Sequence, residues 1–99
     1  MYDDLRDALL AQDFMELDPS GRQEFCAAAG MAANGEYLIL LDMYRKDVSV
    51  FIEQTSVATS EGSLTSLAKY PPVCVVERGD SRVACDPDSL DLVLSLIAE

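Results

Sequence analysis

The chain has 99 residues, of which 49% are hydrophobic, and it carries 18 acidic against 7 basic side chains, for a formal net charge of −11. This length fits a single domain over residues 1–99, with enough apolar content for a core. The lack of histidine excludes Ser-His-Asp and Cys-His nucleophiles, and the acidic balance excludes a basic nucleic-acid footprint.

The negative charge is concentrated at the two ends of the chain. Residues 1–18 contain six acids and one arginine, and residues 86–99 contain four acids and no basic residue. Such a field steers association with a surface of opposite charge, although acidic ends can also serve solubility alone. We therefore expect a basic surface of another protein as the partner. The candidate partner-binding residues are Asp3, Asp4, Asp7, Asp13, Glu16, Asp86, Asp88 and Asp91.

The first segment, Tyr2–Leu17, is predicted to be a helix. Leu5 and Leu9 share one face of it, and the acids at its start suit the positive end of the helix dipole. Acids three or four positions apart on a helix lie about 5–6 Å from each other, which is comparable to the spacing of backbone phosphates. Mimicry of a nucleic acid is therefore an alternative meaning of this run.

A second helix is predicted over Pro19–Ala29. Asp18 before a proline is a typical helix start, and Gly30 is a typical residue just beyond a helix end. We expect Phe25 and Cys26 to face inward from this helix.

The stretch YLILLDMYRKDVSVFI, at residues 37–52, is the longest apolar segment of the chain. A helix would place Tyr37 and Leu41 on one apolar stripe, with charged residues gathered on the opposite face. A hairpin is the alternative, because Val48–Ile52 is rich in strand-forming residues. Its turn at Tyr44–Asp47 would lack Gly or Asn to adopt a positive φ, so we favour the helix.

The next segment, TSVATSEGS at residues 55–63, is predicted to be a polar loop. Ser63 is expected to cap a short helical turn over residues 64–68. Tyr70-Pro71-Pro72 then stops that turn, because proline cannot continue a helix.

A tight antiparallel hairpin is predicted over residues 73–85, with Gly79-Asp80 in the turn. The predicted register pairs Glu77 with Arg82, Val76 with Val83, Val75 with Ala84 and Cys74 with Cys85. The core face of the hairpin would hold Cys74, Val76, Val83 and Cys85. On the other face, Glu77 and Arg82 would form a salt bridge.

The chain is predicted to end in a helix that starts at Asp86-Pro87 and carries an apolar stripe. The stripe consists of Leu90, Val93, Leu94 and Ile97. Asp88-Ser89-Leu90 resembles the DSL motif of acyl carrier proteins, which implies a phosphopantetheine arm on Ser89. In that family two further helices follow, whereas here a hairpin precedes the motif, so we expect an ordinary acidic first turn and no cofactor.

The three cysteines, Cys26, Cys74 and Cys85, show no CxxC spacing, and the acidic start is the opposite of a signal peptide. We therefore expect free thiols, a reducing compartment and a cytoplasmic protein. No metal-ligand pattern is present. The opposed Cys74 and Cys85 could form a disulfide, but buried cysteines are more often small hydrophobes.

The predicted fold is α+β: a mostly helical single domain with a C-terminal hairpin and a terminal helix. We expect a small non-enzymatic binding protein whose acidic ends dock on a basic partner, as do phage-type inhibitors of host or defence proteins and immunity proteins. The alternative is a subunit similar to a secretion chaperone, or an obligate oligomer such as a homodimer, that uses exposed apolar surface. Its motivation is the set of apolar residues off the main stripe, Leu38, Ile39, Met43 and Val50.

Overall fold

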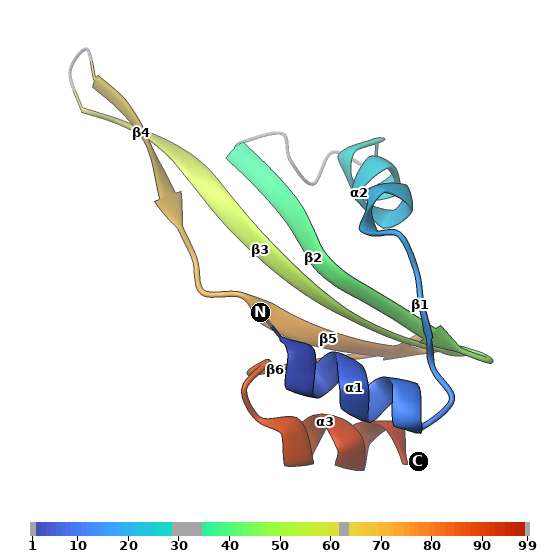
Figure 1. Ribbon diagram of the computed structural model, residues 1–99. Helices are drawn as coiled ribbons and strands as arrows, with labels where there is room; N and C mark the ends of the chain where they lie inside the picture. The colour runs from blue at the N-terminus through green and yellow to red at the C-terminus, as the bar shows by residue number, and fades with distance from the viewer. Residues whose placement is uncertain (1, 29–34, 62–63, 99) are drawn as a thin grey trace.

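An antiparallel sheet is the framework of the computed structural model, which describes residues 2–28, 35–61 and 64–98 (Figure 1). Within these residues the elements are α1 (Asp3–Ala11), β1 (Met15–Glu16), α2 (Pro19–Ala28), β2 (Gly35–Arg45), β3 (Val48–Glu61), β4 (Leu64–Lys69), β5 (Val73–Arg78), β6 (Ser81–Cys85) and α3 (Leu90–Ile97). The path through the sheet is β1-β2-β3-β5-β6, and β4 also pairs with β3. The fold is α+β, but the prediction of a mostly helical domain is wrong.

The helices cover the sheet on both faces. α1 and α3 lie side by side against one face, and α2 lies against the other (Figure 1). The long strand β3 pairs with β5 through Val48–Glu53 and with β4 through Ser56–Glu61. The β3–β4 hairpin therefore projects beyond the helices, which gives the molecule extents of 50 × 25 × 22 Å.

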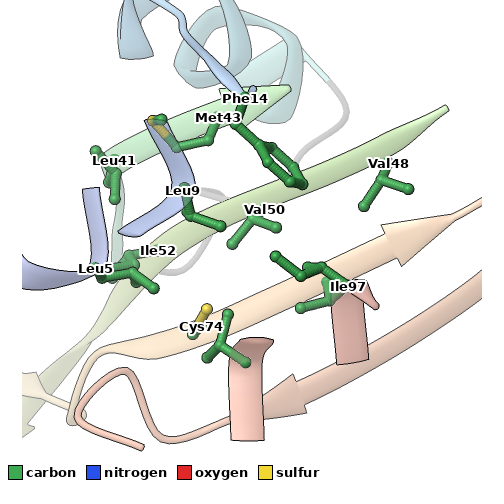
Figure 2. Packing of buried hydrophobic residues seen from close by; sticks show 12 residues of the cluster. Leu5, Leu9, Phe14, Leu41, Met43, Val48, Val50, Ile52, Cys74 and Ile97 are labelled. Atoms are coloured by element: carbon green, nitrogen blue, oxygen red, sulfur yellow. The ribbon is translucent and has the colours of Figure 1, made fainter. Parts of the chain in front are cut away.

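The larger core cluster fills the space between the sheet and the helices α1 and α3 (Figure 2). Leu5 and Leu9, one turn apart on α1, point toward the sheet, as do Val93 and Ile97 on α3. The sheet contributes Leu41, Met43, Val48, Val50, Ile52, Cys74 and Val76. Full burial of an aliphatic side chain of this size stabilises a fold by about 1.5–3 kcal/mol, so this cluster fixes both helices on the sheet.

A smaller cluster lies on the opposite face, beneath α2. It consists of Cys26, Tyr37, Ile39, Phe51 and Val75. A bulge in β2 lets this strand supply both clusters, because Ile39 lies opposite Glu53 and the next paired residue, Leu41, lies opposite Ile52. The extra residue changes the phase of the strand, so Ile39 packs under α2 whereas Leu41 packs under α1 and α3.

The predicted helix over residues 37–52 is wrong, because this segment forms the β2–β3 hairpin. Its turn is Lys46-Asp47, between the paired residues Arg45 and Val48. Lys46 adopts φ +54° without being Gly or Asn. The segment is apolar on both faces of the sheet, so it has neither the strand alternation nor the helix period that a half-buried element shows.

The predicted loop over 55–63 and the predicted helical turn over 64–68 are also wrong. β3 continues to Glu61, and β4 returns over Leu64–Lys69, with Ser56 opposite Lys69 and Glu61 opposite Leu64. Backbone pairing, with β2 as far as Val57 and with β4 over Ser56–Glu61, overrides the polar composition of this part of β3. The predicted cap at Ser63 lies outside the described residues.

The C-terminal hairpin is confirmed at every predicted pair. β5 and β6 pair Cys74 with Cys85, Val75 with Ala84, Val76 with Val83 and Glu77 with Arg82. Gly79 in the turn has φ +57°, which glycine adopts without strain. Two details are wrong: Val83 is 40% exposed rather than in the core, and Glu77 pairs with Arg22 while Arg82 pairs with Glu53.

The predicted helices are found with shifted ends. α1 stops at Ala11 rather than Leu17, and α3 starts at Leu90 rather than at Asp86-Pro87. α2 starts at Pro19 as predicted, where Asp18 accepts a hydrogen bond from the Ser20 amide at 2.9 Å. This bond also lowers the pKa of the Asp18 carboxyl.

The inward face predicted for α2 is half right. Cys26 is buried, but Phe25 is 74% exposed. The predicted last residue of this helix, Ala29, and the predicted end signal, Gly30, lie outside the described residues.

Candidate protein-binding site

The first acidic group lies at the start of α1. Asp3 and Asp4 occupy the first turn, where the positive end of the helix dipole stabilises negative charge. Because Leu5 and Leu9 face the core, the acids of this helix stay exposed. Arg6 offsets part of the charge through an ion pair with Asp3 at 2.8 Å.

The second acidic group precedes and begins α3. The Asp86 carboxylate accepts a hydrogen bond from the Asp88 amide at 2.8 Å, and the Asp86 carbonyl accepts one from the Ser89 amide at 3.0 Å. These bonds form a turn at 86–89, which is why the helix begins only at Leu90. Asp91 follows in the first helical turn, and all three acids are exposed.

The fold brings the two acidic ends of the chain together. The N-terminal ends of α1 and α3 lie on the same side of the molecule (Figure 1). A hollow of about 620 Å³ opens between them. It is lined by Tyr2, Asp3, Asp4, Leu5, Pro87, Asp88 and Leu90. Residues that are more than 80 positions apart in the sequence thus share one surface.

The electrostatics of Tyr2 report on this convergence. Partial burial of its phenol raises the pKa, and the nearby carboxylates of Asp88 and Asp86 raise it further. Negative charge beside a phenol disfavours its ionised form, so the acids of α3 act on a residue of the N-terminus. We call the set Asp3, Asp4, Asp86, Asp88 and Asp91 the acidic surface.

The other three candidate residues are exposed but are not gathered in the hollow. Asp7 lies one turn further along α1. Asp13 lines a different hollow, together with Arg45 and Lys46. Glu16 lies in β1 opposite Met43. The structure therefore separates Asp13 and Glu16 from the acidic surface, although the sequence grouped them with Asp3 and Asp4.

Sequence reasoning missed a second polar cluster, which lies on the face of the sheet that carries α2. Nε of Arg22 lies 3.2 Å from Oδ1 of Asp42, which is only 3% exposed, and its guanidinium stacks 4.0 Å from the ring centre of Phe51. Glu77 lies 3.4 Å from the same guanidinium. The ion pair with Asp42 lacks hydrogen-bond geometry, so both atoms are buried without a hydrogen-bond partner. The one signal in the sequence was an aspartate inside an apolar run.

A second part of this polar cluster surrounds Glu53. Its carboxylate accepts a hydrogen bond from the Tyr37 hydroxyl and lies 3.3 Å from the Arg82 guanidinium. Burial and the hydrogen bond to Glu53 raise the pKa of the Tyr37 phenol. The paired charges connect α2 and β6 to the middle strands, which is a structural role.

Gln23 covers the open edge of β2. Its side-chain amide donates to the Tyr37 carbonyl, and its Oε1 accepts a hydrogen bond from the Ile39 amide at 2.8 Å. These are the groups through which β2 would bind a further strand, so α2 closes this edge of the sheet.

The cysteines are free thiols, as predicted. Burial is the main cause that raises the pKa of Cys74 to about 12, and it also raises the pKa of Cys85. A thiol with a raised pKa is a poor nucleophile near neutral pH. Among the described residues there is no group of three or more potential metal ligands.

The apolar residues that motivated the chaperone-like alternative are mostly internal. Ile39, Met43 and Val50 are buried, and only Leu38 of the four is exposed, at 41%. Other exposed apolar side chains include Phe25, Leu92 and Val83.

Comparison of the chain with protein-family models, with curated proteins and with solved structures finds no match in any of the three. No helix in the described part of the chain has both the length and the apolar character needed to cross a membrane. A functional proposal therefore rests on the geometry and charge of the site.

Proposed function

We propose that this chain is a non-enzymatic protein-binding module whose acidic surface docks on a basic surface of a partner protein. The observation that carries the proposal is the convergence of Asp3, Asp4 and Asp88 around one hollow. Asp86 lies close to Tyr2 of the same hollow, and Asp91 lies in the first turn of α3. Charges that act from one surface steer and orient a partner better than the same charges scattered over the molecule.

The proposed role is that of an inhibitor or neutraliser, of the kind that phage inhibitors and immunity proteins represent. A small protein with a net charge of −11 blocks a basic surface of a partner by binding to it, without catalysing a reaction. We further propose that it acts in the cytoplasm, where its free thiols stay reduced.

The acids also have a structural role that an experiment must separate from binding. Carboxylates at a helix N-terminus each stabilise the helix by about 0.3–1 kcal/mol, and they do so without any partner. Loss of binding in a variant therefore counts only if the variant remains folded.

The test compares two triple variants that remove the same amount of charge. The first, Asp3→Asn/Asp4→Asn/Asp88→Asn, neutralises the acidic surface. The matched control, Asp13→Asn/Glu16→Gln/Asp47→Asn, neutralises exposed acids outside it. Each protein is immobilised to capture partners from the native host, and the affinity for a purified captured protein is then measured at rising salt.

We expect the first variant to lose the captured partner while the control retains it, and we expect the wild-type affinity to fall as salt rises. Equal loss in both variants would show that only net charge matters. A salt-independent affinity, or full capture by the first variant, would contradict the proposal.

A further inference from the structure

The strand β6 is an open edge of the sheet. Within the part of the chain that the structure describes, it pairs with β5 alone, and the side chains of Ser81–Ala84 are exposed. The edge of β2 differs, because β1 pairs with one part of it and Gln23 covers another. An exposed edge presents unpaired N–H and C=O groups that can bind another strand.

The register of the hairpin identifies the outward backbone groups. A two-residue turn is closed by a hydrogen-bonded pair, here Arg78 and Ser81, and hydrogen-bonded and non-hydrogen-bonded pairs then alternate. Val83 therefore bonds to β5, whereas Arg82 and Ala84 direct their N–H and C=O groups away from it. No protein group within the described residues bonds to these outward groups.

We propose that β6 pairs in antiparallel fashion with β6 of a second copy of this chain, centred on Ala84. In this register Arg82 of each copy faces Asp86 of the other, the first residue after β6, which brings opposite charges near each other twice. Centring on Val83 would instead place Asp80 opposite Asp86, and centring on Arg82 would place two arginines opposite each other. Among these three registers, charge complementarity favours the one centred on Ala84.

The apolar face of β6 supports the same arrangement. Val83 is 40% exposed although it lies on the face of the larger core cluster, beside the half-buried Cys85. In the proposed register Val83 of each copy lies opposite Cys85 of the other. The pairing would therefore cover Val83, the large exposed apolar side chain of this edge, and join the two sheets into a single continuous sheet.

The proposal goes beyond docking on a foreign partner and is tested on the purified chain alone. Its mass is measured by light scattering after size-exclusion chromatography, from micromolar to millimolar concentration. We expect a mass that approaches twice the 10.8 kDa of one chain as concentration rises. A mass of one chain over the whole range would overturn the proposal.

Two variants at the axis test the backbone pairing. Ala84→Pro removes an outward N–H but leaves the hydrogen bonds between β5 and β6 intact, so the dissociation constant should rise on the order of tenfold or more. The matched control Ala84→Val keeps the N–H and should retain the dimer. Circular dichroism verifies that both variants fold, and an unchanged dimer in the proline variant would refute the pairing.

A charge exchange tests the register independently. Arg82→Asp places two acids together, and Asp86→Arg places two arginines together, so either change alone should shift the equilibrium toward monomer. The double variant Arg82→Asp/Asp86→Arg recreates the opposite-charge pair and should restore the dimer. Restoration cannot come from the contact of Arg82 with Glu53, because the double variant lacks it too. Failure to restore in a folded double variant would exclude this register.

Discussion

Asp13 adopts φ +67°, a left-handed conformation that usually belongs to glycine. The Phe14 amide bonds to the Leu9 carbonyl at 3.0 Å, and the Asp13 amide bonds to the Leu10 carbonyl at 3.1 Å. This pattern is the Schellman motif that ends many helices, and Phe14 and Leu9 also share the larger core cluster. The left-handed residue therefore ends α1 and directs the chain into β1.

Asp13→Gly should raise the free energy of unfolding by about 0.5–1 kcal/mol, because glycine relieves the left-handed strain. Urea denaturation measures the change. Asp7→Gly is the matched control, since it places glycine within α1 and should lower stability. If Asp13→Gly also lowered stability, the carboxylate of Asp13 would have a role that the geometry does not reveal.

Cys74 makes stability depend on pH in the alkaline range. Its pKa is raised from 9.0 to about 12 by burial, so the folded chain holds this proton where the unfolded chain releases it. The stabilisation is complete below pH 9 and is lost as the pH rises through 12, with a slope of up to about 1.4 kcal/mol per pH unit.

The comparison of wild type with Cys74→Val isolates this effect. The free energy of unfolding of wild type should fall more steeply above pH 9 than that of the variant, because valine does not titrate. Parallel curves in denaturant titrations at several pH values would show that the thiol is not buried as described.

At the scale of elements, Gln23 connects α2 to the edge of β2 through its contacts with Tyr37 and Ile39. Gln23→Ala should lower the free energy of unfolding by about 1–3 kcal/mol, because two backbone groups of β2 lose their partner. Hydrogen exchange should accelerate at the Ile39 amide. Glu24→Ala, at an exposed position of the same helix, should change neither property. Unchanged exchange at Ile39 would mean that water or backbone replaces the glutamine.

The elements that the sequence predicted well are those with local signals. The β5–β6 hairpin has a glycine at the position of positive φ, and α2 has Asp18-Pro19 at its start. The β2–β3 hairpin has no such signal, because Lys46 takes the positive φ and both faces of the strands are buried. Its identity depends on the helices that cover the two faces of the strands, and these helices lie outside the segment.

In the candidate site, too, some features follow from single residues, whereas others depend on the packing of distant elements. All eight acids are exposed, as charged side chains usually are. Their grouping depends on the packing of α1 beside α3, which the sequence does not encode locally. The buried pair of Arg22 and Asp42 likewise depends on where α2 lies.

At the scale of the whole molecule, the sheet places its two neighbouring helices with their N-terminal ends together (Figure 1). Two positive dipole ends meet there, and the acids of the acidic surface offset them. The same convergence concentrates negative charge on one side of the molecule. Stability of the helix ends and attraction of a basic partner thus come from one arrangement.

The phenol of Tyr2 provides a direct measure of this convergence. Its pKa is raised by burial and then by Asp88 and Asp86, which belong to the other end of the chain. Asp88→Asn should therefore lower the pKa of Tyr2, measured by following its ring signals in an NMR titration. The substitution keeps the Asp88 backbone amide that bonds to Asp86. Asp80→Asn, in the β5–β6 turn, removes the same charge far from the hollow and should leave the titration of Tyr2 unchanged. If both variants left it unchanged, the two acidic ends would not meet in solution, and the acidic surface would lose its basis.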